Sequence, residues 1–450
     1  MSFAPIADFV LGAPDIPDSA YDMAATLLID TIGITAAAAG LDAGQIARDH
    51  AAAFHAAGAP EHAAPMLFDG RPVSIPGAAF AAATQTDNLD GHDGLNATKG
   101  HIGCAVVPAL FAFAAQRPDL SAREALTAMI LAYEISARAA ITLHATVSDY
   151  HTSGAWNALG VAALGARLLE LTSDQLRQAL GIAEYHGPRS QMMREIAHPT
   201  MLHDGSGMGA LVGSMAALLA QQGFTGAPAI TVDSAEAVPF WADLGTDWTI
   251  KKNYIKPYPI CRWAHGALEA LEQIRRRQNF TADDVTAIDV ATFAQSAALY
   301  PGLPETTGQA QYALPFPLAV LMVHGAIGPD HISGPGLRDP QVAALLPRIT
   351  VREEPRHSAR FPAGRWSDVT VTLRDGTRLD SGDTNARGGP EAPLTLDEIA
   401  TKFRTMTVGL SPTRTEALWT MRARLLDPGT AFADLAALSL DPPETASPPG

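Results

Sequence analysis

Cysteine is scarce in this sequence: its 450 residues contain only Cys104 and Cys261. Two thiols cannot cross-link a chain of this length, which excludes a disulfide-stabilised secreted scaffold and indicates free thiols in a reducing compartment. The N-terminal stretch has no basic segment and carries Asp8, so we expect no signal peptide. These features predict a cytoplasmic protein.

Basic residues are also few, with 31 Lys and Arg against 47 Asp and Glu, a net charge of −16. Such a chain repels phosphate backbones and anionic membrane surfaces, so we expect neither nucleic acid nor membrane as a partner. The longest apolar runs, such as 210–220, are shorter than the ~20 residues of a membrane span. Hydrophobic residues make up 47%, which supplies a large core and excludes a disordered chain.

Helical signals dominate the first half of the chain. Ser121 with Glu124, and Thr172 with Gln175, are spaced as N-terminal capping boxes before apolar helical runs. Glycines recur every four residues over 205–213, which places them on one helix face and permits close helix packing. We therefore expect the first half of the chain to be helical.

The pattern changes after about residue 280. Residues 285–293 are rich in β-forming side chains, and 366–382 alternate apolar and polar residues around Asp375-Gly376, a hairpin signal. Residues 309–327 predict an apolar helix, and helical pattern returns from Thr395 to about 426. The expected fold is mainly α, with a large all-helical domain over 1–255 and 398–450. An inserted α+β lid domain over 256–397 would leave a cleft for a ligand.

Ionisable residues are concentrated in two stretches. Residues 87–101 form a Gly-rich loop between apolar helices, and such a loop can supply acids, bases and carboxylate-binding cations. Residues 253–265 form an extended segment with Pro257 and Pro259, and Arg262 would stand at the start of the next helix, where an anion is favoured. Ordinary solvated loops are the alternative for both. The candidate residues are Asp87, Asp90, His92, Asp93, Lys99 and His101 in the first stretch and Lys256, Arg262 and His265 in the second.

Three further stretches carry single candidates. His151, which follows Tyr150 and precedes a helix, could act as a general base, although a lone histidine is more often structural. His203 lies in a Gly-rich stretch that lacks the spacing of a phosphate loop. Tyr312 begins an apolar helix and by itself indicates only a core residue.

The histidines form no H-x-x-x-H or H-E-x-x-H pair, and no G-x-S-x-G elbow is present. We therefore expect no metal site and no serine-hydrolase triad. A metal-dependent hydrolase using His92, Asp93 and His101, and an acid-binding protein without catalysis, remain alternatives from other classes.

Taken in order, these stretches are similar to the MmgE/PrpD family over nearly the whole chain. The resemblance rests on the following segments: LLIDTIGITAAAAG, LDGHD with KGHIGCAVVPAL, YHTSGAWNALG, LHDGSGMGALVG, KPYPICRWAHGALEAL, QYALPFPLAV, LRDGTRL and EIATKFR. It implies a helical domain with a smaller α+β lid, a homodimer, and no metal or organic cofactor. It also implies a small polycarboxylate substrate whose C–H, C–O or C–C bond next to a carboxylate is broken or remade.

The resemblance assigns roles residue by residue. Catalytic roles are implied for Asp90, His101, His151, Lys256 and Tyr312, and substrate-binding roles for His92, Lys99, Tyr150, His203 and Arg262. In one departure, Thr200 stands three residues before His203, where many members carry a lysine. The departure suggests one fewer substrate carboxylate, or Lys99 as the replacement cation.

These roles predict abstraction of a proton α to a carboxylate, with the developing charge held by cations. The wording of the ATKGH and LHDGSGMGA segments is closer to the epimerase branch, so the leading prediction is epimerisation of an iminodisuccinate-like dicarboxylate. Dehydration of a 2-methylcitrate-like hydroxy acid, or a related decarboxylation, is the alternative.

Overall fold

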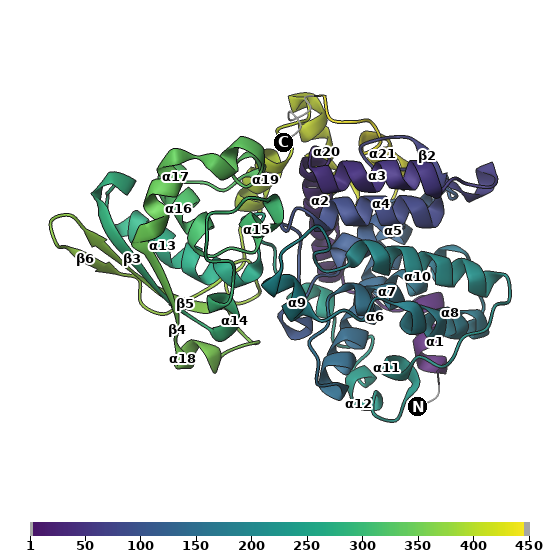
Figure 1. Ribbon diagram of the computed structural model, residues 1–450. Helices are drawn as coiled ribbons and strands as arrows, with labels where there is room; N and C mark the ends of the chain where they lie inside the picture. Colours follow the sequence, from purple (N-terminus) through teal and green to yellow (C-terminus); the bar gives the residue numbers. More distant parts are fainter. Residues whose placement is uncertain (1–2, 445–450) are drawn as a thin grey trace.

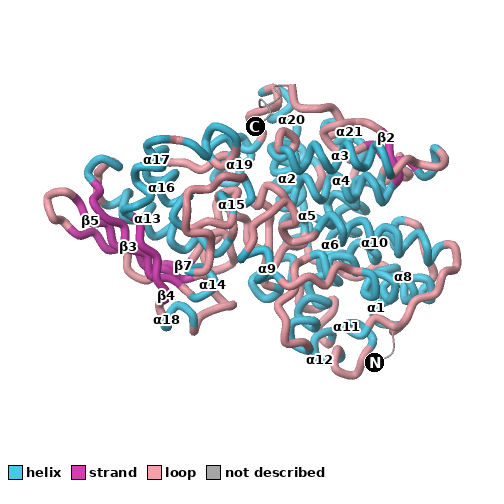
Figure 2. Tube along the Cα trace, in the orientation of Figure 1, coloured by secondary structure: helices cyan, strands magenta, loops and turns pink. Residues whose placement is uncertain are grey.

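The computed structural model describes residues 3–444, so the outermost ends of the predicted helical domain lie outside the described residues. Figure 1 shows two parts side by side, a larger helical part and a smaller part whose sheet lies on the side away from the helices. Figure 2 shows that long loops run between them. The fold is mainly α, as the sequence predicts.

The larger part contains helices from both ends of the chain. Its helices are α1 (Ala4–Leu11), α2 (Asp18–Ala38), α3 (Asp42–Phe54), α4 (Ile75–Asp87), α5 (Gly103–Ala114), α6 (Ala122–Thr146), α7 (Gly154–Leu168), α8 (Ser173–His186), α9 (Met192–Ala197), α10 (Ser206–Gln221), α11 (Ile230–Asp233), α12 (Val238–Trp241), α19 (Leu396–Met406), α20 (Pro412–Arg424) and α21 (Phe432–Leu438). It also carries a short hairpin of β1 (Ala63–Pro65) and β2 (Pro72–Ser74). Its core joins residues 6–255 to residues 399–435.

The smaller part has its own core, built largely from residues 260–373. Its helices are α13 (His265–Arg277), α14 (Ala294–Ala297), α15 (Thr307–Gln311), α16 (Pro315–His324), α17 (Pro340–Leu345) and α18 (Pro355–Ser358), and its strands are β3 (Val285–Thr292), β4 (Ile349–Glu353), β5 (Trp366–Leu373), β6 (Arg378–Asp380) and β7 (Thr384–Asn385). The sheet order is β4-β3-β5-β6, with β7 beside β5. Only the β3–β4 pair is parallel. Helix α13 packs on β5 and on α16.

Several local predictions are confirmed. Thr172 and Gln175 form a reciprocal capping box at the start of α8. Ser121 caps α6 through the Glu124 N–H, but here only the serine half of the box is formed. The turn at Gly376, with φ +85°, joins β5 to β6 in the predicted hairpin.

The glycines of α10 allow α7 and α10 to pack closely, as their spacing predicts. A Cβ atom at Gly209 would lie 2.9 Å from Gly154 Cα, and one at Gly213 would lie 2.4 Å from Ala158 O. Both contacts are too short for a side chain. The close packing holds the start of α7 against the segment that leads into α10.

One predicted helix is interrupted. The helix expected over 309–327 is split into α15 and α16, with Tyr312 at the C-terminal end of α15. Pro315 and Pro317 explain the break, because proline lacks the N–H that would donate to the carbonyl four residues earlier, here the carbonyls of Gln311 and Ala313. The break releases Tyr312 from a continuous helix face.

Helix α6 is long and apolar enough to cross a membrane, but 89% of its most apolar window is buried within the described structure. Helices α2 and α3 pass the same test only as a pair and are bent by 91° relative to each other. Burial of this extent is typical of a core helix in a soluble protein.

Candidate active site

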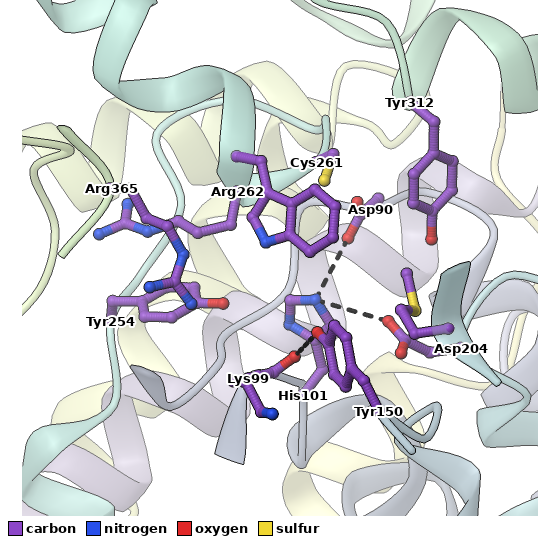
Figure 3. A pocket seen from close by; sticks show the side chains of 12 residues that line it. Asp90, Lys99, His101, Tyr150, Asp204, Tyr254, Cys261, Arg262, Tyr312 and Arg365 are labelled. Atoms are coloured by element: carbon purple, nitrogen blue, oxygen red, sulfur yellow. Dashed lines mark hydrogen bonds and ion pairs between the residues drawn. The ribbon is translucent and has the colours of Figure 1, made fainter. Parts of the chain in front are cut away.

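A small pocket lies where the two parts of the molecule meet (Figure 3). The helical part contributes the loop after α4, the segment that leads into α7, α9 and the segment that leads into α10. The smaller part contributes the segment before α13, the break between α15 and α16, and the residue before β5. The lining residues are Asp90, Lys99, His101, Tyr150, Met192, Asp204, Tyr254, Cys261, Arg262, Trp263, Tyr312 and Arg365. Segments far apart in sequence thus meet in one pocket.

Lys256 and Asp90 form a buried ion pair, of which only Asp90 lines the pocket. The Lys256 ammonium donates to the Asp90 carbonyl at 2.9 Å and also to the Asp90 carboxylate. Burial raises the pKa of Asp90, and the positive charge of Lys256 opposes this rise. Lys256 is completely buried and does not line the pocket. It therefore reaches the site through Asp90.

His101 is oriented by its own loop. Its Nδ1 lies 2.7 Å from the carbonyl oxygen of Asp93. A carbonyl only accepts, so Nδ1 carries the proton and Nε2 keeps the lone pair. Nε2 lies 3.6 Å from Asp204 Oδ2 and 3.8 Å from Asp90 Oδ1. Burial, helped by the charge of Lys256, holds the pKa of His101 well below its usual value. The imidazole is neutral and can accept a proton.

Tyr312 directs its hydroxyl toward the acidic residues of the pocket (Figure 3). In Figure 3 its hydroxyl points toward the side on which Asp90 and Asp204 lie. Burial raises the pKa of Tyr312 well above its usual value, so the phenol stays protonated and can donate a hydrogen bond.

Cations gather on the opposite side. Figure 3 shows Arg262 and Arg365 beside Tyr254, with His101 between this group and Asp204. The Arg262 guanidinium lies over the Tyr254 ring, 4.1 Å from its centroid, and donates to the main-chain carbonyls of residues 386 and 387. Burial lowers its pKa only to about 10, so it stays charged at neutral pH. This side of the pocket suits a carboxylate.

Lys99 and Tyr150 line the pocket together and contact each other. The Lys99 ammonium lies 4.6 Å from the centroid of the Tyr150 ring, and the Tyr150 hydroxyl donates to the Lys99 carbonyl. Lys99 itself adopts a left-handed backbone conformation, with φ +56°. The third cation of the site is therefore positioned by an aromatic ring.

Besides Lys256, three other residues with predicted catalytic or binding roles do not line the pocket. The His151 ring is bound to the Asp149 carbonyl at 3.0 Å. His92 is buried behind His101, with the two ring centroids 4.6 Å apart, and burial lowers the pKa of His92 to about 3. His203 packs 5.3 Å from the Tyr312 ring. The roles predicted for these three residues remain predictions.

Two groups of buried side chains have the donor types that a metal ion needs. Each group brings its ligand atoms within 4.8 Å of one another: Asp90, His92 and His101, and Asp87, His92 and Cys104. A divalent cation on Asp90 would have to displace the Lys256 ammonium. Asp93, of the metal-hydrolase alternative, belongs to neither group and accepts from the Tyr133 hydroxyl at 3.2 Å. The first group therefore suits an ion pair better than a metal.

Family models match most of the chain. The MmgE/PrpD N-terminal domain matches residues 5–238, and the MmgE/PrpD C-terminal domain matches residues 258–426. The chain belongs to the MmgE/PrpD family. Its similar relatives include cis-aconitate decarboxylase of Mus musculus, 22% identical over 73% of this chain and 70% of that protein. Cis-aconitate decarboxylase of Aspergillus terreus is 24% identical over 73% of this chain and 72% of that protein.

Thr200 shows how this MmgE/PrpD member departs from the lysine-bearing pattern. Its N–H and hydroxyl donate to the Glu195 carboxylate at 2.7 and 3.2 Å. Thr200 is exposed and does not line the pocket. No cation therefore comes to the pocket from this position, whereas Lys99 does line it.

Among the lining residues with charged or hydroxyl side chains, sequence reasoning missed three in this MmgE/PrpD site. Asp204 follows His203 directly, and an acid within a Gly-rich stretch was a usable signal. Tyr254 lies in the second polar stretch and was equally visible. Arg365 had no such signal, because it precedes β5 and stands far along the chain from the other motifs.

Proposed function

We propose that this protein is a lyase that acts on a small acid with two or three carboxylates. It would cleave a bond next to a carboxylate and return a proton to the carbon. The observation that carries the proposal is the division of the pocket into two sides. Arg262 and Arg365 lie on a cationic side, and His101 and Tyr312 carry proton-transfer groups toward the other side; Lys99 lines the pocket beside Tyr150.

The chemistry follows from this division. Breaking a bond next to a carboxylate leaves negative charge that spreads onto the carboxylate oxygens, and positioned cations stabilise that charge. His101, with a lone pair on Nε2, can take a proton from the substrate. Tyr312 and other protonated groups can give one. A lyase of this kind needs only these side chains and the substrate.

The names of the relatives indicate the first substrate to test. The relatives from Mus musculus and Aspergillus terreus are cis-aconitate decarboxylases, and cis-aconitate carries three carboxylates. Decarboxylation would leave an electron pair on carbon, which a pocket acid would protonate. Identity of 22–24% supports the lyase class more than this particular acid.

Epimerisation is the second candidate, and Thr200 favours it. The missing cation at that position fits an acid with two carboxylates better than one with three. An iminodisuccinate-like compound has two carboxylates and an acidic proton next to one of them. The same neutral base and protonated acids would remove and return that proton.

Access to the pocket requires movement. Its free volume is about 20 Å³, which is room for one water molecule and not for a polycarboxylate. Arg262, Tyr312 and Arg365 belong to the smaller part, and Asp90 and His101 to the helical part. Separation of the two parts would open the pocket between them, so we propose that the smaller part acts as a lid.

Turnover in D₂O tests the proposal. The protein is incubated with cis-aconitate, then with chiral hydroxy and amino dicarboxylates, and each mixture is followed by NMR and polarimetry. A lyase releases CO₂ or water and places deuterium on the product carbon or forms an alkene. An epimerase exchanges deuterium with loss of optical rotation and no alkene. Recovery of every acid unchanged, without deuterium, would contradict both candidates.

A further inference from the structure

The two carboxylate oxygens of Asp204 have different surroundings: one accepts hydrogen bonds from Ser153, and the other faces His101. Oδ1 accepts the main-chain N–H of Ser153 at 3.2 Å and the Ser153 hydroxyl at 2.9 Å. Oδ2 lies 3.6 Å from His101 Nε2 (Figure 3). Asp204 is 4% exposed and lines the pocket. Ser153 therefore fixes the carboxyl group with one oxygen toward His101 and the cavity.

The tautomer of His101 determines what Asp204 must carry. Because the Asp93 carbonyl holds the Nδ1 proton, the neutral ring presents a lone pair at Nε2. A lone pair facing an ionised carboxylate gains nothing, whereas one proton between the two groups makes a hydrogen bond. Such contacts are often long without substrate and shorten in the complex. The other carboxylate near Nε2, that of Asp90, already accepts from Lys256.

We propose that Asp204 is a further catalytic residue, a neutral carboxylic acid that shares one proton with His101 Nε2 and delivers a proton to the substrate. The proposal rests on the lyase function proposed above and adds its proton donor. His101 orients the acid from one side and Ser153 from the other. A protonated carboxyl also leaves the cationic side of the pocket free for the substrate's carboxylates.

The proton transfer balances for the proposed lyase. When CO₂ departs, an electron pair remains on the substrate carbon. That pair forms a new C–H bond as the Oδ2–H bond of Asp204 breaks, and Asp204 is left as a carboxylate. The carboxylate regains a proton from water before the next turnover.

The surroundings favour the protonated form. Burial and then the charge of Asp87 raise the pKa of Asp204, the Ser153 hydrogen bonds and Lys256 oppose the rise, and the resulting pKa is about 7. Burial likewise raises the pKa of Asp87 to about 7, although the Asp87 carboxylate accepts a hydrogen bond from the Ser206 N–H. The titratable and charged groups that face Asp204 from the elements around it are Asp87, Asp90, His101, Cys104, Tyr150, Glu195, Lys256, Cys261 and Tyr312.

Asp87 provides a matched control for Asp204. Both are buried acids that accept a hydrogen bond from a serine, Asp87 from Ser206 and Asp204 from Ser153. Asp87, however, does not line the pocket. Asp204→Asn keeps an oxygen for Ser153 and removes the exchangeable acid. Asp87→Asn removes only a neighbouring negative charge, which lowers the pKa of Asp204.

The first measurement needs no substrate. Carboxyl ¹³C shifts of protein labelled at aspartate are followed from pH 5 to 9. We expect a wild-type resonance that titrates near pH 7 and is missing from Asp204→Asn. In Asp87→Asn the Asp204 resonance remains and titrates at lower pH. An Asp204 resonance that titrates below pH 5 would overturn the shared proton, whatever the enzyme's substrate.

The second measurement uses an acid that the protein turns over in D₂O. We expect Asp204→Asn to lower kcat at least ~100-fold and to remove the fall in kcat as pH rises above about 7. In Asp87→Asn that fall remains and moves to lower pH. Unchanged kcat and pH profile in Asp204→Asn would overturn the catalytic role. If no acid is turned over, the proposed function fails, and the ¹³C titration still decides where the proton lies.

Discussion

The Asp93 carbonyl oxygen lies 2.7 Å from His101 Nδ1, and this contact decides which nitrogen of His101 faces the pocket. Asp93 and His101 lie at the two ends of one loop, whose fold is stabilised by the hydrogen bond that the Leu95 N–H donates to the Gly100 carbonyl. The loop therefore holds the base in one tautomer before any substrate arrives. Such preorganisation removes an orientational cost from the reaction.

Loss of the His101 imidazole should stop turnover. We expect His101→Asn to lower kcat at least ~100-fold, because general acid–base groups contribute ~10²–10⁴-fold, while the fold stays intact. The measurement is initial rates with an acid that the wild-type enzyme consumes, alongside circular dichroism. His186→Asn, at the exposed end of α8, is the control. Wild-type rates in His101→Asn would remove this residue from the mechanism.

His151 is the residue on which family resemblance and pocket geometry differ. The resemblance predicts that His151→Ala lowers kcat at least ~100-fold, although the ring does not line the closed pocket. Tyr150 next to it does, so lid movement could bring the imidazole to the cavity. Rates equal to those of wild type would show that catalysis does not require His151.

Removal of Lys256 should destabilise the protein as well as inactivate it. Lys256→Met leaves the buried Asp90 carboxylate without its counter-charge, and breaking a buried ion pair costs about 3–5 kcal/mol. Thermal unfolding followed by circular dichroism should show a lower Tm. The double variant with Asp90→Asn should recover much of the loss, since no charge then stays unpaired. A Tm for Lys256→Met equal to that of wild type would show that the pair is unimportant for stability.

Arg365 should bind substrate rather than move protons. We expect Arg365→Met to raise KM ~10- to 100-fold, the effect of losing a charged hydrogen bond of ~1.5–3 kcal/mol, with a smaller change in kcat. Arg356→Met is the matched control in the same part of the molecule, because Arg356 is exposed and bound to Asp368. Equal KM values in the two variants would refute a binding role for Arg365.

Stability should fall as pH rises from about 6.5 to 8. Burial raises the pKa values of Asp87 and Asp204 to about 7. Between their unfolded value of 3.8 and about 7 the folded protein holds more protons, so rising pH favours unfolding. His92 and His203, lowered to about 3, act in the opposite direction, but only below about 6.5. Melting curves across this range should be flatter for Asp87→Asn, and a Tm that rises toward pH 8 would contradict the assignment.

Local signals in the sequence predicted the secondary structure well. The capping spacing at Thr172, the turn at Gly376 and the glycine spacing of α10 each act over a few residues, so they are readable without the fold. The prediction of one helix over 309–327 was wrong, because it followed the apolar periodicity and gave too little weight to Pro315 and Pro317. That break is where Tyr312 enters the pocket.

The candidate site was predicted only in part, because its assembly is a long-range event. The polar loop and the segment before α13 were visible as dense ionisable stretches, and Asp90 and Lys256 do meet across them. Arg365 carries no local mark, and only folding of the sheet brings it to the pocket. Burial likewise decides which acid is protonated, and sequence spacing does not report burial.

A crystal structure with a small polycarboxylate bound tests the central claim most directly. The account predicts that one carboxylate contacts Arg262 or Arg365 and that the reacting carbon lies next to Asp204 Oδ2, which shares its proton with His101 Nε2. A ligand bound away from this pocket, or one whose carboxylates face Asp204 while the arginines stay uncontacted, would contradict it.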